Sequence, residues 1–182
     1  MRRGRLVYVM GASGSGKDSL LQALRPRLRG CPAVFARRYI TRPAASRGER
    51  HIAVSPERFA AMRAAGHFVM DWQSHGLCYG IGKGIEATLE HGHVVLMNGS
   101  REYLSEALRR YPALMPVLVE VDPAVLRSRL LARGRESGAD IEERIARASL
   151  SADYPESLCR VDNSGPLEAS VECFYELIRK WM

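Results

Sequence analysis

Short apolar runs alternate with longer amphipathic stretches along most of the chain. Leu6–Met10 is the first such run, and it leads directly into a glycine, which is typical of a buried parallel strand. Further strands are predicted at Ala33–Ile40, His67–Trp72, Val94–Met97, Leu114–Val121 and Leu158–Asp162. Helices are predicted at Lys17–Leu28, Pro56–Ala65, Ile85–Gly92, Arg101–Tyr111, Pro123–Arg133, Ile141–Ala152 and Leu167–Trp181. This alternation favours right-handed βαβ units, and so an α/β fold with a mainly parallel sheet between helical layers.

Several boundaries carry their own local signals. Ser55 before Pro56 fits the N-cap and first position of a helix, and Asp122 before a proline fits the same pair, so capping is the favoured role of Asp122. Ser100 is predicted to cap the helix that follows it. Gly76–Gly84 is rich in glycine and is predicted to form a turn region that holds Tyr79.

Nine residues that run from the end of the first strand into the first turn of the first helix carry the main chemical signal. They are Gly11, Ala12, Ser13, Gly14, Ser15, Gly16, Lys17, Asp18 and Ser19, which match the G-x-x-x-x-G-K pattern of a phosphate-binding loop. Glycines let successive backbone N–H groups turn inward around phosphates, and the N-terminus of the following helix adds its dipole. We therefore predict that these residues bind the phosphates of ATP, with Lys17 reaching the β and γ phosphates.

Asp18 departs from the usual pattern, which has serine or threonine at this position. A carboxylate is a hard oxygen ligand, and without a metal its charge would repel the phosphates. One interpretation is therefore that Asp18 binds Mg²⁺, directly or through water. The alternative is a solvated acid in the first helical turn, which the helix dipole favours. The strand at Val94–Met97 ends in Asn98, so no carboxylate stands there to bind the metal, and Asp18 could compensate for it.

Length, charge and cysteine content narrow the functional classes. The chain has 182 residues, which suits one α/β domain, and no apolar run reaches the roughly 18 residues of a membrane span. The net charge is +7, but only three of the 27 basic residues are lysines, and arginine is suited to gripping phosphate by two hydrogen bonds. We expect small phosphorylated partners, no nucleic acid and no membrane. The four cysteines lack metal-ligand spacing, so we expect reduced thiols and a cytoplasmic protein.

The chain resembles the guanylate kinase superfamily over essentially its whole length. The phosphate loop, Phe68–Trp72, Tyr79-Gly80 and Asn163 resemble motifs of that family. So do Thr41-Arg42 with Arg47-Gly48-Glu49, and the arginines Arg133, Arg144 and Arg147 of a helical lid. The resemblance implies a P-loop NTPase fold of three layers, α/β/α, with a five-stranded sheet, a small acceptor-binding insertion and a helical lid. We expect one domain over residues 1–182, with a core at 1–34 and 92–182, an acceptor-binding region at about 35–91 and a lid at about 130–148.

Four departures separate the chain from guanylate kinases. Asp18 replaces a hydroxyl residue, Ile81 stands where a hydroxyl would help read guanine, and His51 and Ile52 stand where tyrosines are usual. Asn98 stands at the strand end where that family has an acidic residue. A site built for guanine needs matched polar partners. Together with His75–Ile81, Asn98–Arg101 and Asp162–Gly165, these features resemble the ribose 1,5-bisphosphate phosphokinases of phosphonate catabolism.

This resemblance implies an ATP-dependent kinase that makes 5-phosphoribosyl 1-diphosphate from ribose 1,5-bisphosphate, with Mg²⁺. The alternatives are a guanylate or other nucleoside monophosphate kinase and a non-catalytic binding module, and we expect a monomer or homodimer. Phosphoryl transfer needs positioning and charge neutralisation more than covalent help. The expected catalytic residues are Lys17, Arg133 and Arg144, and the expected acceptor-binding residues are Arg38, Arg42, Arg47, Asp71, Tyr79, Asn98 and Arg101. Tyr79 either donates its hydroxyl to the acceptor or packs in the core, and Asp71 either holds a sugar hydroxyl or orients an arginine.

Overall fold

A computed structural model describes residues 3–43, 51–134, 138–149 and 154–182. Its centre is a five-stranded sheet in the order β2-β7-β1-β8-β9, in which every neighbouring pair of strands is parallel. The strands are β1 (Leu6–Met10), β2 (Ala33–Phe35), β7 (Val94–Asn98), β8 (Met115–Glu120) and β9 (Cys159–Asp162). The prediction of a five-stranded, mainly parallel sheet is confirmed.

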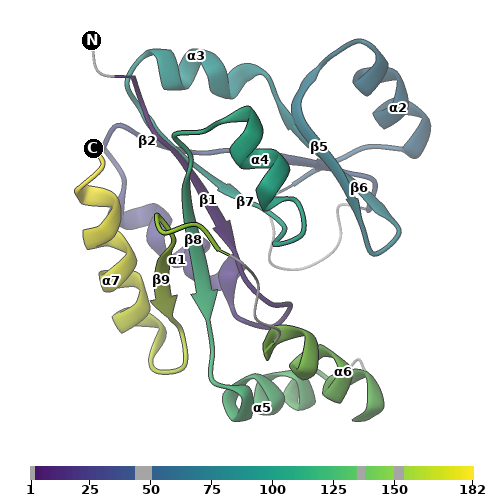
Figure 1. The fold of residues 1–182 in the computed structure, drawn as a ribbon, viewed down its shortest axis with the longest axis vertical. Coiled ribbons are helices and arrows are strands. Elements are labelled where there is room, and N and C mark those ends of the chain that lie inside the picture. Colours follow the sequence, from purple (N-terminus) through teal and green to yellow (C-terminus); the bar gives the residue numbers. More distant parts are fainter. Residues whose placement is uncertain (1–2, 44–50, 135–137, 150–153) are drawn as a thin grey trace.

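Helices cover both faces of this sheet (Figure 1). α1 and α7 bury leucine, valine and phenylalanine side chains on one face, and α3 and α4 pack on the other. α5 and α6 lie beyond the carboxyl ends of the strands (Figure 1). The helices are α1 (Lys17–Arg27), α2 (Pro56–Ala64), α3 (Gly84–Glu90), α4 (Leu104–Arg110), α5 (Pro123–Arg133), α6 (Gly138–Ser149) and α7 (Leu167–Arg179). This is the three-layer α/β/α arrangement expected from the sequence.

β1 is the central strand, and all five of its residues are buried. Leu6, Tyr8 and Met10 pack with α3 and α4, whereas Val7 and Val9 pack with α1 and α7. Burial on both faces explains why the strand is apolar throughout instead of alternating. None of the helices among the described residues has both the length and the apolar character needed to cross a membrane.

A second sheet of four strands stands beside the first, in the order β4-β3-β6-β5. Its strands are β3 (Arg38–Ile40), β4 (Ile52–Ala53), β5 (Phe68–Ser74) and β6 (Leu77–Gly82). The prediction of one strand over Ala33–Ile40 is therefore wrong, because the chain leaves the parallel sheet after Phe35 and joins the second sheet at Arg38. The strands of the two sheets run in different directions, so the chain turns between them. Ala36 and Arg37 lie at this turn and belong to neither β2 nor β3.

The predicted glycine-rich turn at Gly76–Gly84 is also wrong, because most of it forms β6. β6 pairs with β5 on one side and β3 on the other, so the ladders outweigh the weak strand preference of glycine. The turn is confined to His75 and Gly76, which have φ angles of 49° and 73°. Positive φ at both central residues is the geometry that favours a tight two-residue hairpin.

Two of the three predicted helix caps are confirmed. The Ser55 hydroxyl accepts from the Arg58 backbone N–H at 3.2 Å, and the Asp122 carboxylate accepts from two backbone N–H groups of α5. Ser100 is not a cap, because α4 begins only at Leu104 and the Ser100 hydroxyl instead donates to Glu102. The segment after β7 is thus a loop longer than predicted.

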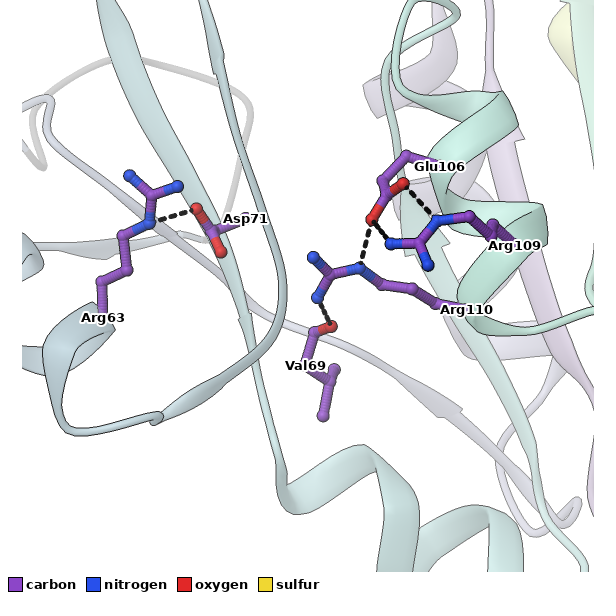
Figure 2. Close-up of polar contacts among 6 residues, drawn as sticks. All are labelled: Arg63, Val69, Asp71, Glu106, Arg109 and Arg110. Atoms are coloured by element: carbon purple, nitrogen blue, oxygen red, sulfur yellow. Dashed lines mark hydrogen bonds and ion pairs between the residues drawn. The ribbon is translucent and has the colours of Figure 1, made fainter.

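A polar link joins the two sheets where α4 meets the start of β5 (Figure 2). Arg110 donates from Nη1 to the backbone oxygen of Val69 at 2.8 Å, and from Nε to the Glu106 carboxylate at 2.7 Å. Arg109 makes two more bonds to Glu106. These hydrogen bonds hold the pKa of Glu106 down at about 2, well below its ordinary value of 4.5.

We expect the contribution of Glu106 to stability to depend on pH. A carboxyl group whose pKa is lowered by folding stabilises the fold above its unfolded pKa, and this contribution is lost as the pH falls toward its folded pKa of about 2. The difference in unfolding free energy between the wild type and Glu106→Gln should therefore shrink between pH 6 and pH 2.5 in urea titrations. Glu168→Gln, on α7, is the control, and an equal pH trend in both variants would contradict the assignment.

Candidate active site

The phosphate loop joins β1 to α1 over residues 11–16. Gly16 immediately precedes the helix in a left-handed conformation, with φ 84°, so this position favours glycine. α1 begins at Lys17, as predicted, and its Nζ donates to the backbone oxygens of Gly11 at 2.8 Å and Ala12 at 3.2 Å. The ammonium group therefore lies against the loop that is expected to receive the phosphates.

Asn163 fixes this loop from the end of β9. Its side-chain amide donates to the backbone oxygen of Ser15 at 2.7 Å, and the residue is only 3% exposed. Arg129 of α5 donates in turn to the backbone oxygen of Asn163 at 2.8 Å. The loop is thus tied to two elements that lie far from it in sequence.

Asp18 and Asn98 are in direct contact at the base of the loop. Asn98 ends β7, and its Nδ2 donates to Asp18 Oδ1 at 2.7 Å. β7 pairs with β1 so that Asn98 lies beside Val9, which brings the strand end to the first turn of α1. The loop carboxylate and the strand-end amide, which the sequence suggested as a compensating pair, are therefore neighbours.

Tyr8 holds the loop that follows Asn98. Its hydroxyl donates to the Ser100 backbone oxygen at 2.8 Å and accepts from the Ser100 backbone N–H at 2.9 Å. A Cβ on Gly99 would lie 2.1 Å from the Tyr8 ring, so glycine is needed for this close approach. Burial raises the pKa of Tyr8, which keeps the hydroxyl protonated. Nothing in the sequence indicates this role, because the pattern around Tyr8 predicts only a core residue of β1.

Hydrogen bonds to β6 and to His51 fix the Thr41–Arg42 segment. The Thr41 hydroxyl accepts from the Cys78 backbone N–H at 2.9 Å. His51, which is buried, places Nε2 3.2 Å from the Arg42 backbone oxygen. These contacts hold the backbone that carries the Arg42 side chain.

A stack of three aromatic rings lies beside Arg38. The Arg38 guanidinium lies 5.2 Å from the centre of the Tyr79 ring, which stacks on Trp72 at 5.5 Å. Trp72 stacks in turn on Tyr103 at 5.3 Å. These contacts fix the direction of Arg38 and the plane of Tyr79. Tyr79 packs as one alternative predicted, and it also borders the cavity.

One cavity of about 290 Å³ joins the two halves of the site. The phosphate-loop residues 11–19 all line it except Ser15, which is buried. The predicted acceptor residues that line it are Arg38, Arg42, Tyr79, Asn98 and Arg101. Trp72 and His75, which were not predicted as site residues, line it as well. Residues from Gly11 to Glu102 are thus brought to one hollow.

Two further predicted site residues, Asp71 and Arg144, do not line this cavity. Asp71 pairs with Arg63 of α2 at 2.8 Å (Figure 2) and borders a different hollow, so it orients an arginine instead of facing the phosphate loop. Arg144 of α6 donates to the Ser13 hydroxyl at 2.7 Å. Arg47 and the side chain of Arg133 lie outside the described part of the structure.

The donor set fits a magnesium ion. Among the described residues, no three His, Cys, Asp or Glu side chains gather as a metal cluster. Magnesium, however, is usually bound by one or two carboxylates together with substrate phosphates and water. Asp18 supplies one carboxylate at the phosphate loop, and the buried Asn98 Oδ1 lacks a hydrogen-bond partner among the described residues.

Comparison with known proteins decides the family. The family described as AAA domain matches residues 7–148. The ribose 1,5-bisphosphate phosphokinase PhnN of Pseudomonas fluorescens (strain SBW25) is 54% identical over 93% of this chain and 92% of its own length. The corresponding protein of Azotobacter vinelandii is 51% identical over 97% of both. The chain belongs to the ribose 1,5-bisphosphate phosphokinase family.

Solved structures agree on the fold of this ribose 1,5-bisphosphate phosphokinase family member. A guanylate kinase from Anaplasma phagocytophilum superposes with a TM-score of 0.69 at 17% identity, covering 100% of this chain and 88% of that one. A sugar kinase from Janibacter gives a TM-score of 0.54 at 18% identity, over 97% and 95% of the two chains. The predicted guanylate kinase-like P-loop fold is confirmed.

We expect Gly16→Ala to abolish the loop geometry. The new Cβ would lie 2.4 Å from Asn163 Nδ2 and would force alanine into a left-handed conformation. ADP affinity, measured by calorimetry, should fall by at least about tenfold, which corresponds to 1.4 kcal/mol.

Gly30→Ala is the matched control for this variant. Gly30 has a similar φ of +80°, but a Cβ there would meet nothing within 4 Å. It should cost about 1–2 kcal/mol of stability for the backbone strain alone and leave ADP affinity unchanged. Equal loss of ADP affinity in both variants would show that strain, and not the contact with Asn163, controls the loop.

Proposed function

We propose that this protein transfers the γ-phosphoryl group of ATP to the 1-phosphate of ribose 1,5-bisphosphate. The products are 5-phospho-α-D-ribose 1-diphosphate and ADP. The observation that carries the proposal is the cavity that joins an intact phosphate loop to Arg38, Arg42 and Arg101, in a chain about half identical to proteins named for this substrate. We further propose the domain division given above, with an acceptor region at about 35–91 and a lid at about 130–148.

Phosphoryl transfer between two phosphate groups depends mainly on the positioning of the two reactants. An oxygen of the 1-phosphate attacks the γ-phosphorus of ATP, and the bond between that phosphorus and the β–γ bridging oxygen breaks, so ADP leaves with the oxygen. A phosphate oxygen is already ionised, so the chain needs no general base. Holding the two reactants in line in one hollow, with charge neutralised, supplies the catalysis.

Each cation has a role in this scheme. Lys17 binds the β and γ phosphates from the loop, and Arg144 reaches the same loop from α6 through Ser13. Arg133 is proposed to act with Arg144 on the transferring phosphoryl group. Asp18 would hold a magnesium ion, which would supply positive charge against the phosphates of ATP and so reduce their repulsion of the acceptor.

The acceptor is gripped from the second sheet and from the loop after β7. Arg38 and Arg42 come from the former and Arg101 from the latter, so two phosphates of one small sugar can be bound from different sides, and Asn98, also a predicted acceptor residue, lines the same cavity. Arg47 remains a predicted member of this group, and Tyr79 a predicted hydroxyl donor. Asp71 is better explained as the partner of Arg63.

The same fold would also suit a guanylate kinase, but Ile81 argues against it. This residue is fully buried in the core cluster that contains Tyr8 and Met70, and it offers no polar group to a base. A non-catalytic module would have little use for a complete phosphate loop with lysine.

One assay tests the activity. ATP and Mg²⁺ are offered with ribose 1,5-bisphosphate, with guanosine monophosphate, or with neither, and ADP release is measured. Turnover with the sugar bisphosphate alone is expected, together with 5-phosphoribosyl 1-diphosphate in equal amount. Strong turnover with guanosine monophosphate alone would overturn the proposal, and no turnover with either acceptor would favour the non-catalytic module.

Arg42→Ala should raise the KM for ribose 1,5-bisphosphate by about 10–100-fold, because a hydrogen bond to a charged group contributes about 1.5–3 kcal/mol. The KM for ATP should change by less than about twofold, because the loop that binds ATP is untouched. Arg58→Ala, an exposed arginine on α2, is the control in steady-state kinetics. A rise confined to the KM for ATP would refute the acceptor assignment.

A further inference from the structure

Within the part of the chain that the structure describes, only one of the two polar atoms of the Asn98 side chain makes a hydrogen bond. Because the side chain is buried, the unpaired atom lowers the stability of the fold. The residue is 9% exposed, and its amide nitrogen is committed to Asp18. Its Oδ1 is buried without a hydrogen-bond partner among the described residues. The reverse orientation of the amide would set two acceptor oxygens 2.7 Å apart, so Nδ2 must be the atom that faces the carboxylate.

An unpaired buried acceptor requires a proton donor or a cation from outside the protein. Oδ1 cannot bind a phosphate oxygen, because both are acceptors. It can bind a water that coordinates a cation, and it borders the cavity that also contains Asp18 and Lys17. The geometry therefore favours a hydrated cation at this point.

The choice of asparagine over aspartate also follows from the contact. P-loop enzymes commonly hold magnesium with a loop hydroxyl and a strand carboxylate. Here the loop already carries the carboxylate. An aspartate at position 98 would have no N–H to donate to Asp18 and would set two acceptor oxygens 2.7 Å apart.

We propose that Asn98 is a positioning residue for the metal, which orients Asp18 through Nδ2 and receives a metal-bound water at Oδ1. This deepens the proposed kinase function and rests on it only for the use of a metal–nucleotide complex. The backbone of Asn98 is held for this task on two sides. It pairs with Val9 in the sheet, and the next two residues are held by Tyr8.

The test measures metal affinity and not turnover. Mn²⁺ binding to the enzyme–ADP complex is followed by the electron paramagnetic resonance signal of free Mn²⁺, and metal-free ADP affinity by calorimetry. Asn98→Ala should weaken Mn²⁺ binding by about tenfold or more, as is common for residues that orient a metal ligand. Metal-free ADP affinity should change by less than about twofold, because the hydrogen bond of the Asn98 side chain goes to Asp18 and not to residues 11–16, whose backbone surrounds the phosphates.

One exchange makes the test specific. The double variant Asp18→Asn/Asn98→Asp restores one carboxylate and one amide, and should bind Mn²⁺ more tightly than Asp18→Asn alone. Glu168→Gln is the control, with unchanged affinity.

The inference is overturned if Asn98→Ala binds Mn²⁺ as the wild type does, or if it loses metal-free ADP affinity to the same extent. It is also overturned if the double variant is no better than Asp18→Asn. None of these measurements contains an acceptor. Failure to phosphorylate ribose 1,5-bisphosphate would therefore refute the proposed function without touching this result.

Discussion

The pairing of β1 with β7 and β8 is the constraint on which the rest of the site depends. Because the three strands are parallel and adjacent, their carboxyl ends meet at one edge of the sheet. β1 ends there in the phosphate loop, and β7 ends there in Asn98. A parallel sheet collects ligands at this edge because each strand end releases the chain into a loop there. The contact of Asn98 with Asp18 across 80 residues of sequence follows directly from this register.

The second sheet is not an independent unit attached by a linker. Met70, Trp72 and Ile81 belong to the same buried cluster as Tyr8 and Met97 of the parallel sheet. Hydrophobic burial thus sets the position of the second sheet relative to the phosphate loop, and the bond from Arg110 to Val69 adds a polar link at the junction (Figure 2). α5 and α6 are attached differently. Leu126, Leu130 and Ile141 form a small cluster of their own, against which Ala12 of the phosphate loop and Val121 pack.

The sequence was sufficient where the signal is local. Apolar runs located β1, β7, β8 and β9 and the start of β2, and the glycine pattern located the loop with Lys17 and Asp18. It failed where tertiary pairing overrides local preference, as at Gly76–Gly84, where two neighbouring strands hold a glycine-rich segment extended. It could not find Tyr8, Arg129 or the role of Asn163 in holding Ser15, because these depend on which distant backbone groups meet. Family resemblance supplied Asn163 as a motif but not the bond that it makes.

The position of negative charge in the site bears on what it can bind. Lys17, Arg38, Arg42 and Arg101 line the cavity and attract phosphates, whereas Asp18 and Glu102, which also line it, repel them. A carboxylate in a phosphate site is favourable when a cation is bound with the phosphates, since like charges at short range in a sheltered hollow are strongly unfavourable. In the proposed scheme, the carboxylate that holds the cation lies on the loop, and β7 ends in the neutral amide of Asn98. Asn98 would then border a phosphorylated acceptor without adding to its repulsion.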